Sequence, residues 1–153
     1  MTLQAVITAL VNAGDGQSIA VAGYDTYTIH GYDPPPPKWD TYEIPGLYVL
    51  TGASTDVPQG DDGADVLENR AFHIQVPFMP VGASTPYSRE VIGRPILDAM
   101  KLVYRDFARN GLVTGVFQMR VVNDSGIAIL TEYDGQFIGF DIEMLVQMMI
   151  DPR

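Results

Sequence analysis

Carboxylates are the most concentrated chemically useful side chains in this sequence, and five of them fall between residues 56 and 68. Oxygen ligands at such density invite a calcium site, but calcium loops need fixed ligand spacing and a glycine at the sharp turn. With Glu68 as the last ligand of a loop of about 12 residues, Val57 would be the first ligand and Asp62 would occupy the glycine position. The spacing does not fit, so we expect no metal site here.

The other groups that could catalyse a reaction are two histidines and a pair of strand carboxylates. His30 and His73 lie outside any metal-ligand spacing, so we interpret both as ordinary surface histidines. Asp141 and Glu143 share one face of a predicted strand, but acid–base catalysis needs a cleft that keeps one carboxyl group protonated, and we favour a solvated strand face. The sequence has no glycine-rich phosphate loop, Walker motif or GxSxG motif. We therefore expect a protein that is not an enzyme and binds no cofactor.

Composition narrows the class of protein further. The chain has 153 residues, 46% of them hydrophobic and 18% charged, and we assign residues 1–153 to a single domain. Its 19 acidic and 9 basic residues give a formal charge of −10, which disfavours general nucleic-acid binding and an anionic membrane surface. The absence of cysteine excludes disulfides and thiolate metal sites. The residues Met1–Ala13 lack the pattern of a signal peptide, so we expect synthesis in the cytoplasm and no membrane partner.

One long helix, predicted over Tyr87–Asn110, would position most of the basic side chains. Apolar residues recur there at steps of three and four, which places them on one face. Gly93 and Pro95 interrupt the pattern, because proline removes a backbone donor. Either a short turn ends near Gly93, or one kinked helix continues, which we favour. A second face carries charged residues at the same spacing: Arg94, Asp98, Lys101, Arg105 and Arg109.

The first part of the chain predicts a short helix and two short strands. The helix would begin after Thr2 as N-cap and end at Gly14. Ile19–Val21 and Tyr24–Ile29 are rich in aromatic and β-branched residues, which is typical of strands. Asp33–Lys38 contains four consecutive prolines and predicts a polyproline connector. A ligand for a proline-recognising module is the alternative, and we favour a stiff spacer.

Two further predicted strands flank a long polar segment. Ile44–Thr51 is continuously apolar, which indicates burial on both faces, and Arg70–Met79 alternates between apolar and polar residues. Pro77 predicts that the second strand lies at a sheet edge or ends there. Structureless loops longer than about 12 to 15 residues are uncommon, so we expect Gly52–Asn69 to be the tip of an extended hairpin arm.

The last third of the chain predicts a β-meander of Val116–Val122, Ile127–Tyr133 and Phe137–Ile150. One face of the last strand is apolar throughout, while the other begins charged and ends with Leu145 and Met149. Those two apolar side chains need a cover, supplied either by the first helix or by a neighbouring subunit.

Together these elements predict an α+β fold: a mostly antiparallel sheet with an N-terminal helix and one long central helix packed on it, plus the extended hairpin arm. Opposite charges on the arm and the long helix favour docking between subunits; the alternative is an intramolecular or solvated arrangement. The predicted interface residues are Asp56, Asp61, Asp62, Asp65, Glu68, Arg94, Lys101, Arg105, Arg109, Leu145 and Met149.

An ordered set of segments carries a family resemblance. Ile44–Ala53 (IPGLYVLTGA) precedes the acidic segment, Arg70–Val76 (RAFHIQV) follows it, a helix then contains Pro95, and Asp141–Val146 (DIEMLV) lies in the last strand. In this order they resemble the tail-terminator proteins of long-tailed bacteriophages, the family of the lambda minor tail protein U. The resemblance covers about two thirds of the chain, and the proline run departs from it.

The resemblance implies a structural virion protein that forms a ring, usually a hexamer, in the tail-neck region after assembly in the host cytoplasm. Such rings cap the tail tube, stop its polymerisation and provide the head–tail joining surface. The implied partners are further copies of the chain, the tail-tube protein on one side and a head-completion or connector protein on the other, with DNA only passing through the lumen. The alternatives are a head-completion (stopper) protein of the neck and a tail-tube subunit.

Overall fold

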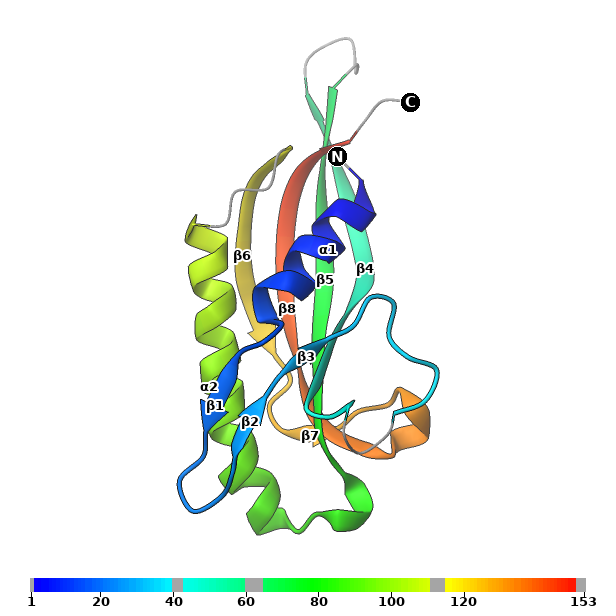
Figure 1. The fold of residues 1–153 in the computed structure, drawn as a ribbon. Coiled ribbons are helices and arrows are strands. Elements are labelled where there is room, and N and C mark those ends of the chain that lie inside the picture. Colours follow the sequence, from blue (N-terminus) through cyan, green and yellow to red (C-terminus); the bar gives the residue numbers. More distant parts are fainter. Residues whose placement is uncertain (1, 40–42, 60–64, 111–114, 151–153) are drawn as a thin grey trace.

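The computed structural model describes residues 2–39, 43–59, 65–110 and 115–150, and it has the predicted α+β fold (Figure 1). Both helices pack on one face of a six-stranded sheet whose main path runs β3-β4-β5-β8-β6, with β7 paired to β8. All its pairs are antiparallel except β3 with β4. The strands are β3 (His30–Gly31), β4 (Gly46–Gln59), β5 (Asp65–Pro80), β6 (Val116–Asp124), β7 (Ala128–Ile129) and β8 (Phe137–Ile150).

The N-terminal segment forms the predicted helix and a separate two-stranded sheet. Helix α1 (Leu3–Gly14) begins where the Thr2 hydroxyl accepts a hydrogen bond from the Ala5 amide at 3.2 Å, which confirms the expected N-cap. Strands β1 (Ser18–Ala20) and β2 (Thr26–Thr28) pair with each other, in the two regions predicted as strands. The parallel pairing between β3 and β4 was not predicted, because it joins segments that a loop separates.

Helix α2 (Pro86–Asn110) is one continuous element that contains Pro95, as expected. Gly93 is buried, and a Cβ there would lie 2.7 Å from the Phe78 ring and 2.8 Å from Ile127. The glycine therefore allows a close approach of helix to sheet. Tyr104 of this helix is fully buried and donates a 2.6 Å hydrogen bond to the Leu10 carbonyl oxygen of α1.

The hydrophobic core lies between the two helices and the facing side of the sheet. It includes Val6, Leu10, Phe72, Ile74, Ile96, Met100, Phe140, Ile142, Met144 and Val146. In β8 these are alternate residues, so the other set, including Leu145 and Met149, points to the opposite side of the sheet. We call this opposite side the outer face.

The hairpin arm is present, but its strands are longer than predicted. The β4–β5 ladder continues from Ser54 opposite Arg70 to Gln59 opposite Asp65, after an irregularity between Thr51 and Ser54. The paired ribbon extends beyond both helices at the top of Figure 1. Most of the segment expected to be a loop is thus an ordered two-stranded ribbon, because its residues obtain backbone partners across the hairpin.

Pro77 was predicted to lie at a sheet edge or a strand end. Strand β5 runs between β4 and β8, but its pairs with β4 stop at Gln75, so Pro77 pairs only with β8 and lies three residues before the strand ends, as predicted. A register shift between Pro77 and Met79 accommodates the missing donor. The expected meander is wrong, because β6 pairs directly with β8, while β7 is only two residues long. The chain after β7 turns through a 3₁₀ segment, Tyr133–Gly135, in which Tyr133 and Asp134 have positive φ, and these residues cannot continue a strand.

Candidate functional site

The five carboxylates predicted to form one acidic surface have different surroundings. Asp56 lies opposite Glu68 in the arm ladder, and Asp65 lies opposite Gln59. Asp61 and Asp62 fall outside the described residues. Glu68 is only 6% exposed and forms an ion pair with Arg70, so it is not the exposed carboxylate that was expected, and its contact with another subunit stays a prediction.

Arg70 fixes the base of the arm. Its guanidinium donates hydrogen bonds of 2.8 Å to the Gly52 carbonyl oxygen and 3.2 Å to the Ser54 hydroxyl. Gly52 lies within the register shift between Thr51 and Ser54, at which β4 leaves the regular sheet, and Ser54 lies at its end. Arg70 and Glu68 lie opposite Val146 and Met148 of β8, on the helix-covered side, which explains why a charged pair is buried there. A buried pair of this kind fixes geometry more than it adds stability.

The basic residues on the charged face of α2, which we call the basic stripe, divide into two parts: Arg94 with Lys101, and Arg105 with Arg109. Lys101 donates a 2.8 Å hydrogen bond to Asp124 of β6, and Arg94 pairs with Glu90 one turn earlier. The Lys101 hydrogen bond, together with the Gly126 amide, lowers the pKa of Asp124 below its ordinary value. Lys101 therefore has a partner within the subunit, which is the alternative to a role at an interface. Arg105 and Arg109 are both exposed, and their contact with another subunit stays a prediction.

A groove separates the C-terminal half of α2 from the edge strand β6. It has a volume of about 280 Å³ and is lined by Arg105, Ala108, Arg109, Met119, Arg120 and Val121. We call it the arginine groove. Arg120 was missed by the sequence analysis, because nothing in the local pattern of β6 says that this strand lies beside α2.

Leu145 and Met149, the two apolar residues predicted to need a cover, are half-buried on the outer face. A hollow of about 210 Å³ beside Leu145 is lined by Asn69, Gln118, Arg120, Leu145 and Gln147. Helix α1 packs on the other face, where Gly14 approaches Leu47 and Tyr104. The first of the two predicted covers is therefore wrong, and a neighbouring subunit remains a prediction.

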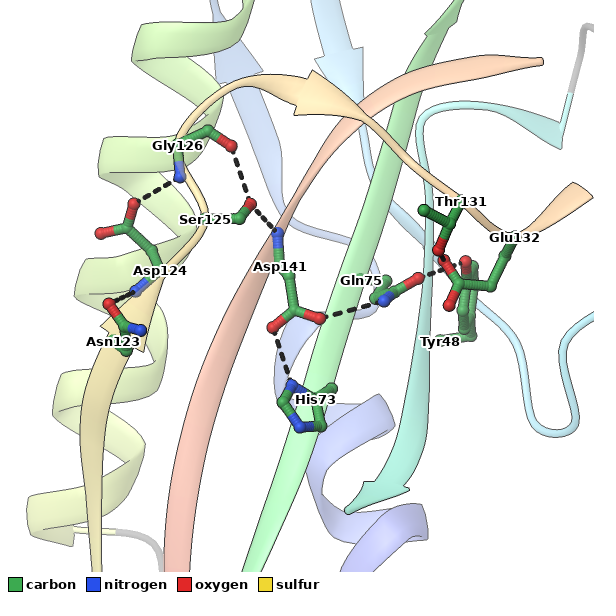
Figure 2. A network of polar contacts seen from close by, with 10 residues as sticks. All are labelled: Tyr48, His73, Gln75, Asn123, Asp124, Ser125, Gly126, Thr131, Glu132 and Asp141. Carbon is green, nitrogen blue, oxygen red and sulfur yellow. Dashed lines mark hydrogen bonds and ion pairs between the residues drawn. The ribbon is translucent and has the colours of Figure 1, made fainter. Parts of the chain in front are cut away.

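A chain of polar side chains crosses the outer face from β4 to β8 (Figure 2). The Tyr48 hydroxyl donates to Gln75 Oε1 at 2.7 Å, and Gln75 Nε2 donates to Asp141 Oδ2 at 3.0 Å. The other oxygen of Asp141 lies 3.0 Å from His73 Nδ1, and the Asp141 amide donates to the Ser125 hydroxyl at 2.9 Å. Asp141 and His73 were expected to be simply solvated, whereas the register of β5 with β8 brings them together.

The hydrogen bonds of this polar chain hold neighbouring strands together, and its groups line none of the hollows described above. Burial raises the pKa of Tyr48, whose side chain lies beneath aromatic rings, so its hydroxyl stays protonated as a donor. Each group in the chain has a hydrogen-bond partner, and no hollow described above includes Gln75 or Asp141. The chain therefore joins three adjacent strands on a face that has no helix to cover it.

An aromatic cluster closes the end of the outer face that lies away from the arm. Its rings pack edge-on or tilted at centroid distances of 4.9 to 6.3 Å, and they belong to Tyr32, Trp39, Tyr48, Tyr133 and Phe137. The Tyr133 hydroxyl donates a 2.5 Å hydrogen bond to the Pro36 carbonyl oxygen. The proline run is thus attached at Pro36 to the 3₁₀ segment Tyr133–Gly135 between β7 and β8. The arm end of the outer face is left as its open part.

Neither a metal site nor a membrane span is found in the part of the chain that the structure describes. There, no three residues of the types His, Cys, Asp or Glu group closely enough to hold an ion. No described helix has the length and hydrophobicity needed to cross a bilayer. A scan against protein-family models and a search of curated proteins both found no match for this chain.

Proposed function

We propose that this chain is a tail-terminator subunit of a long-tailed bacteriophage, a structural protein without catalytic activity that assembles into a ring. The ring, most simply a hexamer, caps the tail tube, stops its polymerisation and provides the surface that joins the head. Its partners are other copies of the chain, the tail-tube protein and a head-completion or connector protein. DNA only passes through the lumen.

The observation that carries this proposal is the arm combined with an open outer face. The β4–β5 ribbon extends past the body of the protein and has Arg70 holding its base. At the same end of the sheet, Leu145 and Met149 are half-buried with no cover from the described chain. An element that extends from one subunit and an apolar surface left open on another are the two parts that self-assembly needs.

The order of the segments that resemble the tail-terminator family adds support. The IPGLYVLTGA and RAFHIQV segments are antiparallel neighbours in β4 and β5, and the DIEMLV segment lies beside RAFHIQV in β8. The three segments therefore form one continuous part of the sheet, from which the arm extends.

Solution mass and negative-stain images of the same sample, with and without purified tail tubes, test this proposal. We expect a closed ring, or a monomer that closes into one ring on the end of an added tube. Open-ended tubes formed by the protein alone would identify a tail-tube subunit instead. Binding to portal-side connector rings but not to tubes would identify a head-completion protein.

A further inference from the structure

The arginine groove gathers positive side chains, and only one of them has a charge partner: Arg105 helps to lower the pKa of the Asp124 carboxyl group. Of nine basic residues in a protein of net charge −10, three line this one groove: Arg105, Arg109 and Arg120. Among the described residues, none of these three guanidinium groups forms an ion pair or a hydrogen bond. The other arginines of α2 have partners, because Arg89 bonds to Ser84 and Arg94 to Glu90.

Arg105 and Arg109 lie one turn apart on α2, and Arg120 lies at the sheet edge, opposite Leu145 of the outer face. Like charges this close repel one another unless anionic groups offset them. The other residues that line the groove are apolar: Ala108, Met119 and Val121. A partner that supplies carboxylates together with apolar contact would therefore match this groove better than water does.

Arg120 connects the groove with the outer face at the edge of the sheet. Arg120 lines both the arginine groove and the outer-face hollow beside Leu145. Strand β6 is the terminal strand of the sheet, with register shifts on both sides of Gln118–Val121. Such irregularities discourage a continuous backbone ladder with a foreign strand, so side-chain charge would provide the recognition.

We propose that the arginine groove receives the acidic arm of a second copy of this chain, an inference that rests on the ring assembly proposed above. The sequence has no lysine or arginine between Lys38 and Arg70, so beyond its base the arm carries acidic charge only. Asp56 and Asp65 lie in its described strands. Among the described residues, the arm is the acidic segment whose paired strands extend beyond both helices (Figure 1).

The arm and the groove lie at different places on the sheet, which determines the type of assembly. The arm extends from β4 and β5, and the groove borders β6, with β8 between β5 and β6. Contacts between two different surfaces are head-to-tail, and they generate a ring when the rotation closes. The contact would repeat identically from each subunit to the next.

Charge reversal tests the pairing directly in the full-length protein. The groove variant is Arg109→Glu with Arg120→Glu, the arm variant is Asp56→Lys with Asp65→Lys, and a quadruple variant combines them. The control, Lys38→Glu with Arg94→Glu, makes the same charge change as the groove variant at exposed sites outside the groove. Sedimentation velocity at low and high salt measures association, and circular dichroism checks folding.

We expect the groove and arm variants each to weaken association by at least about tenfold, while the quadruple variant regains most of it. The control should stay within about threefold of the wild-type protein, and high salt should weaken wild-type association. Failure of the quadruple variant to recover, with both double variants still folded and weakened, would contradict a direct pairing of arm and groove.

The remaining outcomes separate this inference from the proposed function. Wild-type rings that the groove variant leaves unchanged would overturn the groove assignment and leave the tail-terminator proposal standing. Open head-to-tail chains that the groove variant dissolves would support the groove and contradict the terminator. A wild-type protein that is monomeric at every concentration, with and without tubes, would overturn both. Binding of a short DNA duplex that only the groove variant loses, with association unchanged, would identify nucleic acid as the occupant and overturn the inference.

Discussion

Strand β8 contributes alternate residues to two faces of the same sheet, and the two faces have different surroundings. On the helix-covered side, Ile142, Met144 and Val146 are completely buried. On the outer face, Asp141, Leu145 and Gln147 are half-buried and meet polar neighbours or a shallow hollow. Since both sets share one backbone, the difference arises from side-chain chemistry and from what covers each face.

The comparison separates the residues that stabilise the subunit from those available to a partner. Burial of the inner set removes apolar surface from water, which is the main favourable contribution to folding. The outer face is instead held by the hydrogen-bonded chain from Tyr48 to His73 and closed by aromatic rings at one end only. Changes to the two faces should therefore affect different measurements.

The largest expected effect comes from truncation of the inner face. Ile142→Ala should reduce the free energy of unfolding by about 2–5 kcal/mol, because the side chain is fully buried and a cavity would remain. Leu145→Ala, three residues later on the outer face, should cost about 1 kcal/mol or less and instead weaken self-association. Urea unfolding and sedimentation measure the two effects. Equal losses of stability would mean that the outer face is part of the core.

The next effect concerns the polar chain of the outer face. Gln75→Ala should destabilise the subunit by about 1–3 kcal/mol, because it leaves the Tyr48 hydroxyl and one Asp141 oxygen without their partner. His73→Ala, at the exposed end of the chain, should cost less. Thermal unfolding of both variants provides the measurement, and the reverse order would show that the chain is anchored at its histidine end.

Alkaline pH should act through the buried tyrosines. Burial raises the pKa values of Tyr104 and Tyr48 above the ordinary value of 10.0, so the folded protein keeps protons that the unfolded chain loses. The stabilising contribution of these two tyrosines is fully present below about pH 10 and falls as the pH rises further. Tyr104→Phe should cost about 1 kcal/mol at neutral pH and make this fall shallower. An unchanged slope between pH 9 and pH 11 would contradict the assignment.

The smallest effect distinguishes the two parts of the basic stripe. Lys101→Met removes the main cause of the lowered pKa of Asp124. Since a lowered pKa contributes stability above the ordinary value of 3.8, which is lost as pH falls through the folded value, the variant should lose part of its acid dependence below about pH 4. At neutral pH the cost should be at most about 1 kcal/mol, with association unchanged. Loss of association would place Lys101 at an interface after all.

The sequence predicted the elements whose signals are local. The two helices follow from apolar spacing and from Thr2 as a cap, and the arm follows from a strand on each side of a long acidic segment. The α+β class follows from these elements and their order. Even the irregular Gly93 was visible, although its reason, the close approach of Phe78, was not.

The features that the sequence did not predict all depend on register between distant strands. The pairing of β6 with β8 places Arg120 beside the arginines of α2, and the pairing of β5 with β8 joins His73 to Asp141. Glu68 was predicted as an exposed carboxylate because a polar loop was expected where an ordered ribbon exists. Charge counts along a chain cannot say which charges meet within the subunit.

Amide hydrogen exchange on the assembled protein and on protein dissociated by salt tests the central claim most directly, because it reports which surfaces become covered. We expect new protection in β6 and in the strands of the arm, Ser54–Gln59 and Asp65–Asn69, with little change in α1. Protection confined to α1, or none in β6 and the arm, would contradict the claim that the arm and the open side of the sheet form the assembly surface.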